Sequence, residues 1–71
     1  MRNDLTCLEC SILALAASGH ANKQIGLKLN MARKTVTNHL TIIFDKLHVQ
    51  NRTVAVIRAF RLGYLDLKEI A

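Results

Sequence analysis

Residues 33–47 have the sequence Arg-Lys-Thr-Val-Thr-Asn-His-Leu-Thr-Ile-Ile-Phe-Asp-Lys-Leu, which has two distinct faces when arranged at 100° per residue. One face is a narrow apolar stripe with Phe44 at its margin, made of Val36, Leu40, Ile43 and Leu47. The opposite face collects short polar and charged side chains, namely Lys34, Thr37, Asn38, Thr41 and Asp45. We therefore expect a helix that buries its apolar stripe and leaves the polar face open.

The polar face of this stretch is unusual for a helix that only meets water. Such faces are normally rich in Glu and Lys, whereas Thr37, Asn38 and Thr41 are small side chains with low helix propensity. Small polar side chains let another surface approach closely. The pattern favours a binding face.

A short helix is predicted just upstream, over Asn22–Leu29, with Ile25, Gly26 and Leu29 on one face. Glycine inside a helix costs up to about 1 kcal/mol relative to alanine, so we expect Gly26 to allow close approach of another helix. Residues 30–32 then form a break before the long helix.

The first helix is predicted over about Cys7 to Ser18. Thr6 and Glu9 have the spacing of a capping box, and Gly19 supplies a left-handed stop. Its apolar side is expected to consist of Leu8, Ile12, Leu15 and Ala16, with Leu5 packed ahead of them.

A last helix is predicted from Arg52 to about Leu62, with Asn51 as its N-cap and Gly63 after its end. Its core side is expected to be Ala55, Val56, Ala59 and Leu62. An outer strip remains, made of Val54, Ile57, Arg58 and Arg61. We interpret the strip as a dimer interface; the alternative is that it covers another domain of a longer parent protein.

Length and charge limit what this protein can be. Seventy-one residues allow one small domain, and the longest apolar run, Ile12–Ala17, is too short to span a bilayer. The formal charge of +5 favours a polyanionic partner, and between His20 and Leu62 the only acid is Asp45. A helix, a short turn and a second helix with a basic polar face is the helix-turn-helix pattern of DNA-binding proteins.

Catalytic and metal chemistry is not indicated. Cys7 and Cys10 have no histidine at metal-ligand spacing, so we expect no metal and no cofactor. The chain shows no nucleophile-base-acid set and no phosphate-binding glycine loop, so we expect neither an enzyme nor a small-molecule substrate. The first residues lack a secretory signal pattern, which favours a cytoplasmic location and reduced thiols.

Several blocks of residues have a specific order and spacing. They are Leu5-Thr6-x-x-Glu9, Ala17-Ser18-Gly19-x-x-Asn22-Lys23-x-Ile25, Thr35-Val36-x-x-His39-Leu40 and Ile43-Phe44-x-Lys46-Leu47-x-Val49-x-Asn51-Arg52-Thr53-x-Ala55-Val56. Together they resemble the LuxR/NarL/GerE-type effector domain of bacterial transcription regulators, the output domain of response regulators. The resemblance implies one all-α, four-helix helix-turn-helix domain over residues 1–71, with a core of about 5–65. It also implies a scaffold helix at about 22–29, a recognition helix at about 33–47 in the major groove, and dimerisation through the fourth helix.

Carried over position by position, the resemblance places Thr37, Asn38 and Thr41 at base edges. The Asn38 amide can donate and accept at once, as adenine recognition requires. Many relatives carry Lys or Arg where Thr37 stands, so guanine recognition is not carried over, and the alternative is that the two threonines contact only phosphates or water. The phosphate contacts implied are Asn22, Lys23, Arg33, Lys34, Thr35 and Lys46. For any single lysine the alternative is simple solubility.

The chain departs from the family pattern at the helix ends. Ala21 and Ala32 stand where Ser or Thr is common, and each lost cap costs about 0.5–2 kcal/mol unless a neighbouring Asn shifts the cap. His48 stands where Gly or Asn better tolerates a left-handed exit. We expect modest stability, and a buried pairing of Glu9 with Arg52 is a further hypothesis.

The sequence thus predicts a homodimeric, sequence-specific regulator that binds double-stranded DNA, with RNA polymerase as a further candidate partner. One rival is a helical protein-interaction module resembling a promoter-contacting region of sigma factors, which would bind DNA weakly and without sequence preference. The other is a thiol redox switch that uses Cys7 and Cys10.

Overall fold

The computed structural model describes residues 5–66, and in that range the chain forms four helices and no strand. They are α1 (Cys7–Ala17), α2 (Asn22–Leu29), α3 (Arg33–Leu47) and α4 (Arg52–Leu62). The all-α prediction is confirmed; α2, α3 and α4 have the predicted bounds, and α1 ends one residue before Ser18. The outer parts of the expected domain, residues 1–4 and 67–71, lie outside the described residues.

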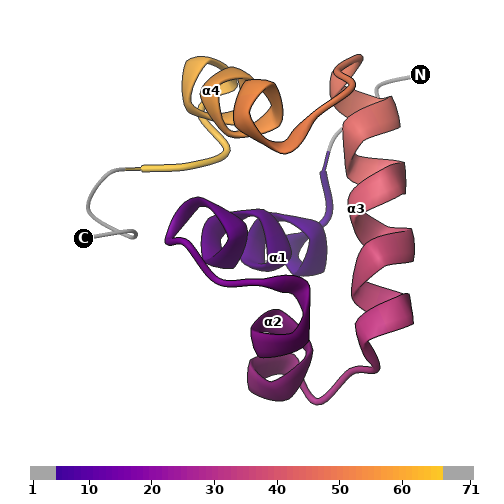
Figure 1. The fold of residues 1–71 in the computed structure, drawn as a ribbon. Helices are drawn as coiled ribbons and strands as arrows, with labels where there is room; N and C mark the ends of the chain where they lie inside the picture. The colour runs from indigo at the N-terminus through magenta and orange to yellow at the C-terminus, as the bar shows by residue number, and fades with distance from the viewer. Residues whose placement is uncertain (1–4, 67–71) are drawn as a thin grey trace.

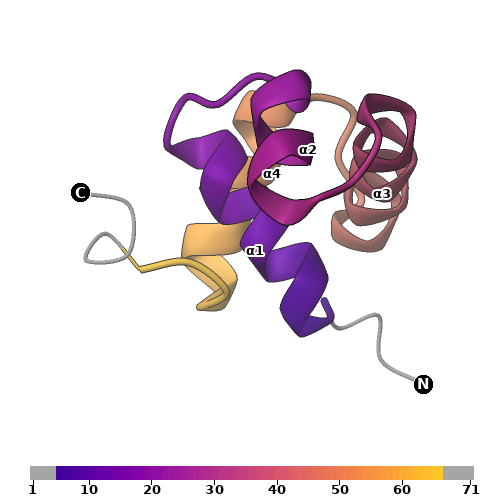
Figure 2. The same cartoon turned by 90° about the horizontal axis from the view of Figure 1, so that it is seen from below.

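The helix α3 lies along one side of the other three. In Figure 1, α4, α1 and α2 are stacked from top to bottom and α3 runs down the right of the stack. Figure 2, turned by 90°, again shows α3 at one side. Both α1 and α3 contact each of the other three helices. Within the described chain, the side of α3 turned away from the stack is therefore not covered by another helix.

The core of the described residues is aliphatic, and only 4% of the residues in the sequence are aromatic. The four residues of the predicted α3 stripe are all buried, and the fully buried side chains from the other helices are Ile12, Leu13, Ile25, Ala55 and Ala59. Each large apolar side chain buried in this way stabilises the fold by about 1.5–3 kcal/mol. Burial of the stripe fixes the rotation of α3 and hence the direction of its polar face.

The buried faces of α1 and α4 differ from the prediction. On α1, Leu8 is 40% exposed, whereas Leu13 and Glu9 are buried. The buried side is rotated because the end of α3 supplies a partner for the Glu9 carboxylate, which can then face inward. On α4, Leu62 is 60% exposed because it lies in the last turn, where the chain leaves the helix at Gly63.

The helix starts follow the predicted capping chemistry in two of four cases. Thr6 Oγ1 accepts from the Glu9 amide at 3.1 Å, and Glu9 Oε1 accepts from the Thr6 amide at 2.8 Å, which completes the capping box. Asn51 also caps α4 through its side chain. Ala21 and Ala32 are the N-cap residues of α2 and α3 and make no side-chain cap bond, so neighbouring asparagines do not take over the cap.

Left-handed residues lie at the end of every helix. Gly19 and Gly63 have φ of +94° and +85°, and the non-glycine residues Asn30 and His48 have φ of +57° and +58°. The predicted glycine stops are confirmed, and His48 adopts the conformation expected for its position. A left-handed backbone costs a residue with a Cβ about 1–2 kcal/mol, so the His48 exit carries strain.

Gly26 lies against the turn between α2 and α3. A Cβ there would be 2.5 Å from the Met31 carbonyl oxygen but 3.6 Å from Val36 Cγ2. The Met31 amide donates to the Gly26 carbonyl at 2.8 Å. The glycine therefore admits the turn backbone, which corrects the prediction that it admits a neighbouring helix.

Candidate nucleic-acid interface

The outward face of α3 presents the predicted base-contacting residues to solvent. Thr37, Asn38 and Thr41 are all exposed, while the stripe behind them is buried. Within residues 5–66 the Asn38 side chain makes no hydrogen bond, so its carbonyl and its NH₂ group are both available to a ligand. This face of α3 is polar and open to solvent.

The two threonine hydroxyls are bonded back to their own helix. Thr37 Oγ1 donates to the Arg33 carbonyl and Thr41 Oγ1 donates to the Thr37 carbonyl, each at 3.1 Å. Threonines in helices commonly make this bond to the carbonyl four residues earlier. Both hydroxyl hydrogens are therefore already used.

Arg52 connects α4 to the start of α2. Its Nη1 donates to Asn22 Oδ1 at 2.9 Å and its Nη2 donates to the His20 carbonyl at 2.6 Å. Asn22 Nδ2 in turn donates to Thr37 Oγ1 at 3.2 Å. The Asn22 side chain, predicted as a phosphate ligand, is thus engaged within the domain. Sequence reasoning missed this role of Arg52; its position at the start of α4 was the only signal.

The predicted phosphate contacts lie in the first turns of two helices. Lys23 is in the first turn of α2, and Arg33, Lys34 and Thr35 open α3; all four are exposed. Backbone amides at a helix start have no partner within the helix and carry partial positive charge. Side chains and amides together make this region favourable for anions.

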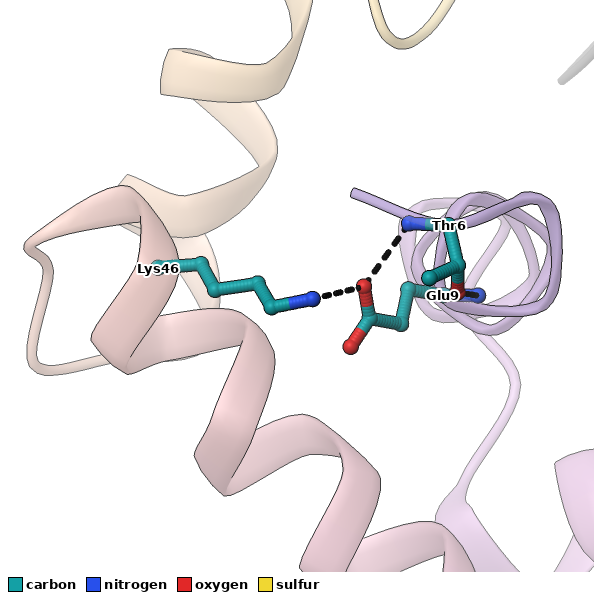
Figure 3. A network of polar contacts seen from close by, with 3 residues as sticks. All are labelled: Thr6, Glu9 and Lys46. Carbon is teal, nitrogen blue, oxygen red and sulfur yellow. Dashed lines mark hydrogen bonds and ion pairs between the residues drawn. The ribbon is translucent and has the colours of Figure 1, made fainter. Parts of the chain in front are cut away.

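Lys46 lies apart from that group. Its Nζ is 2.7 Å from Glu9 Oε1, which joins the end of α3 to the start of α1 (Figure 3). The same Glu9 oxygen accepts from the Thr6 amide. The hypothesis that Glu9 pairs with Arg52 is wrong, because Arg52 is bonded to Asn22 and to the His20 carbonyl.

The environment of Glu9 keeps its carboxylate charged. Burial alone would raise the pKa of Glu9, because the charged form loses hydration. Hydrogen bonds from Lys46 and from the Thr6 amide, together with the positive charge of Lys46, outweigh that effect and hold the pKa of Glu9 below its ordinary value. The ion pair is therefore present at neutral pH.

The outer strip of α4 is exposed, as expected. Ile57 is 51% exposed, and Val54, Arg58 and Arg61 are also exposed. The Arg58 guanidinium has a second contact, because its Nη1 donates to the Leu47 carbonyl at the end of α3 at 3.3 Å.

Other kinds of site are not found in the described part of the chain. Residues 5–66 contain no pocket and no group of three or more His, Cys, Asp or Glu placed to hold a metal ion. Cys7 and Cys10 are not joined in a disulfide. Among these residues, no helix has the length and apolar character that crossing a membrane requires.

Curated relatives are bacterial regulators. The model of a family described as bacterial regulatory proteins, luxR family, matches residues 3–59. The chain is 38% identical over 64 residues to the transcriptional regulatory protein DegU of Brevibacillus brevis, and this alignment covers 90% of the chain. It is 47% identical over 57 residues to the transcriptional regulatory protein LiaR of Bacillus subtilis and 46% identical over 57 residues to the response regulator protein VraR of Staphylococcus aureus, each over 80% of the chain. The chain spans only 27% of the length of each of these relatives.

A solved structure has the same fold. The structure of the transcription factor GerE superposes with a TM-score of 0.85 at 36% identity, covering 89% of this chain and 94% of that one. The four-helix arrangement is therefore shared over nearly the whole of both chains.

Proposed function

The chain belongs to the luxR family of bacterial regulatory proteins, and from that membership we propose that it is a sequence-specific, double-stranded DNA-binding domain of a transcription regulator. The observation that carries the proposal is the outward face of α3, where Asn38 is exposed and unbonded while the opposite stripe is buried. The major groove, about 12 Å wide, admits one α-helix. In this proposal α3 is the recognition helix and α2 the scaffold helix.

Base recognition in this proposal is assigned to Thr37, Asn38 and Thr41. The Asn38 NH₂ group can donate to adenine N7 while its carbonyl accepts from the adenine N6 amino group, and this two-bond pairing distinguishes adenine from the other bases. The threonines lie one turn apart on the same exposed face. Together the three residues can span neighbouring base pairs.

Phosphate binding is assigned to the region where α2 and α3 begin. Lys23, Arg33, Lys34 and Thr35 supply exposed side chains, and Asn22 supplies its backbone amide because its side chain is engaged. Lys46 remains a proposed contact, but DNA must share its ammonium with Glu9. Such contacts orient the domain without sequence preference.

We further propose that two copies pair through the outer strip of α4, formed by Val54, Ile57, Arg58 and Arg61. An apolar centre flanked by arginines is the composition typical of protein interfaces. A symmetric pair would place two α3 helices on two half-sites.

The remaining parts of the proposal concern the whole protein. We propose that residues 1–71 form a single domain. The curated relatives are named as regulators, and DNA binding accounts for the features of this domain, so we propose that it has no enzymatic activity. A protein that binds the bacterial chromosome must share its compartment, so we place it in the cytoplasm. RNA polymerase is a proposed partner, and VraR, named a response regulator, suggests a signal-dependent parent protein.

Selection of binding sites from random duplex DNA tests this function. A consensus should emerge, and because each wrong base pair costs about 1–3 kcal/mol, a duplex with several consensus positions altered should bind at least about 100-fold more weakly. Affinities should be compared at one fixed salt concentration. Weak binding with no consensus would reject the proposal and favour a protein-interaction module.

A further inference from the structure

The hydrogen bonds around Thr37 determine what this residue can offer to a base. Arg52 Nη1 donates to Asn22 Oδ1 at 2.9 Å. Arginine has donors and no acceptor, so the amide atom that faces it must be the oxygen. The Asn22 NH₂ group therefore faces Thr37 and donates to its Oγ1 at 3.2 Å.

The direction of this bond fixes the hydroxyl hydrogen of Thr37. Because Oγ1 accepts from Asn22, its own hydrogen must point elsewhere, and it donates to the Arg33 carbonyl at 3.1 Å. A hydroxyl has one donor and two acceptor lone pairs. The donor and one lone pair are thus occupied, and Thr37 cannot donate to guanine O6 or N7, or to adenine N7, without losing a bond.

The same two bonds hold Oγ1 in one place and therefore hold the side-chain rotamer. Exposed Thr37 keeps one acceptor lone pair of Oγ1 and its methyl, and the methyl is its only apolar group; no donor remains, because Oγ1 is tied to α2 and to the backbone of α3. In the major groove the one apolar group on a base edge is the C5-methyl of thymine. A methyl held in one rotamer, on an exposed residue of a helix proposed to lie in this groove, is suited to contact that thymine methyl.

We propose that Thr37 selects thymine through contact between its methyl and the C5-methyl of the base, and that Asn22 and Arg52 are positioning residues for this contact. The inference rests on the proposed DNA binding by α3. It is specific to Thr37, because Thr41 donates to the Thr37 carbonyl and has no second side-chain bond within residues 5–66.

Uracil substitution in the selected duplex tests the proposal. Deoxyuridine differs from thymidine only by the missing C5-methyl, so each thymine of the consensus is replaced in turn and the dissociation constant is measured. One thymine in each half-site should show a loss of about fourfold, the factor that corresponds to one buried methylene-sized group.

Two variants of Thr37 separate the methyl from the hydroxyl. Thr37→Ser keeps the hydroxyl and its bonds but removes the methyl, so it should bind the thymine and uracil duplexes equally at that position. Thr37→Val keeps a methyl and removes the hydroxyl, so it should retain the preference for thymine. The matched control Thr53→Ser removes a methyl from exposed Thr53 of α4 and should leave the uracil profile unchanged.

Arg52→Lys tests the positioning role. A lysine ammonium cannot hold Asn22 and the His20 carbonyl in the forked geometry of arginine. At the thymine assigned to Thr37, the ratio of the affinity for the thymine duplex to that for the uracil duplex should fall towards one, while the helical circular dichroism is unchanged. An unchanged ratio would show that α3 alone orients Thr37.

The outcomes distinguish this inference from the proposed function. If the wild type selects no consensus, DNA recognition itself is rejected. If the wild type selects a consensus, two results would overturn the thymine contact alone. In the first, Thr37→Ser loses as much affinity as the wild type on uracil substitution at every thymine. In the second, Thr37→Val no longer loses affinity on uracil substitution at any thymine.

Discussion

The proposed role of Asn38 can be tested directly. Its side chain is exposed and makes no hydrogen bond among the described residues, so truncation would remove the proposed DNA contact without removing a hydrogen bond within the domain. Asn38→Ala should weaken binding to the selected duplex by about 1–3 kcal/mol and relax the preference at one base pair. Competition binding with selected and random duplexes measures both effects. Equal losses on the two duplexes would contradict a base contact.

Lys23 provides the opposite test. It is exposed in the first turn of α2, where a phosphate contact is sequence-independent. Lys23→Ala should weaken binding to all duplexes alike and reduce the slope of log affinity against log salt by about 0.9. Titrations at several salt concentrations give this slope. A loss confined to the selected duplex would show that Lys23 contacts a base.

Substitution of Gly26 by alanine has two opposite effects on the stability of the domain. Gly26→Ala gains up to about 1 kcal/mol of helix propensity in α2. The new Cβ would lie 2.5 Å from the Met31 carbonyl oxygen, and backbone cannot move aside as a flexible side chain can. Overpacking costs about 1–3 kcal/mol, so we expect net destabilisation in urea unfolding. A stabilised variant would show that the turn between α2 and α3 can shift.

The Glu9–Lys46 pair makes the packing of α1 against α3 depend on pH. The pKa of Glu9 is lowered in the folded protein, so its contribution to stability is complete above the unfolded value of about 4.3 and is lost as pH falls through the folded pKa. Glu9→Gln should cost about 1–3 kcal/mol at pH 7 and flatten the loss of stability in acid. Urea unfolding at several pH values measures both changes.

A matched control for this pair is Asp45→Asn. Asp45 is exposed on α3 and makes no ion pair among residues 5–66, so its loss should change stability at neutral pH by no more than about 0.5 kcal/mol. A cost equal to that of Glu9→Gln would mean that net charge, and not the ion pair, sets the effect.

Helix bounds were predictable from sequence because they depend on neighbouring residues. The capping box at Thr6, the Asn51 cap and the stop at Gly19 act within one or two turns. The α3 stripe was also predictable, because its period matches the helix. The buried face of α1 was not, since Glu9 turns inward only when Lys46, distant in sequence, lies beside it.

For the candidate site, the exposed face could be predicted from the sequence, but the hydrogen bonds of its side chains could not. Exposure of Asn38 follows from the period of α3, whereas the use of the Asn22 side chain by Arg52 and Thr37 depends on how α2, α3 and α4 meet. The helical period predicts which residues of α3 are exposed. Which of their polar atoms are already hydrogen-bonded depends on the packing of the three helices.

For the molecule as a whole, the outer strip of α4 makes a testable claim about assembly. Ile57→Asp introduces a charge at the centre of that strip, where it would be desolvated on pairing, so dimers should be lost while helicity is retained. Sedimentation equilibrium measures the mass. Leu27→Asp is the control, because Leu27 is 75% exposed but lies on α2. An unchanged mass for Ile57→Asp would remove the interface.

The bond from Arg58 to the Leu47 carbonyl attaches α4 to the end of α3. If two domains pair through α4, this attachment keeps their α3 helices at one separation and one mutual tilt. Each base pair inserted between two half-sites turns one of them by about 35° around the duplex axis. Operator phasing, and not operator sequence alone, would then decide which promoters both copies can occupy at once.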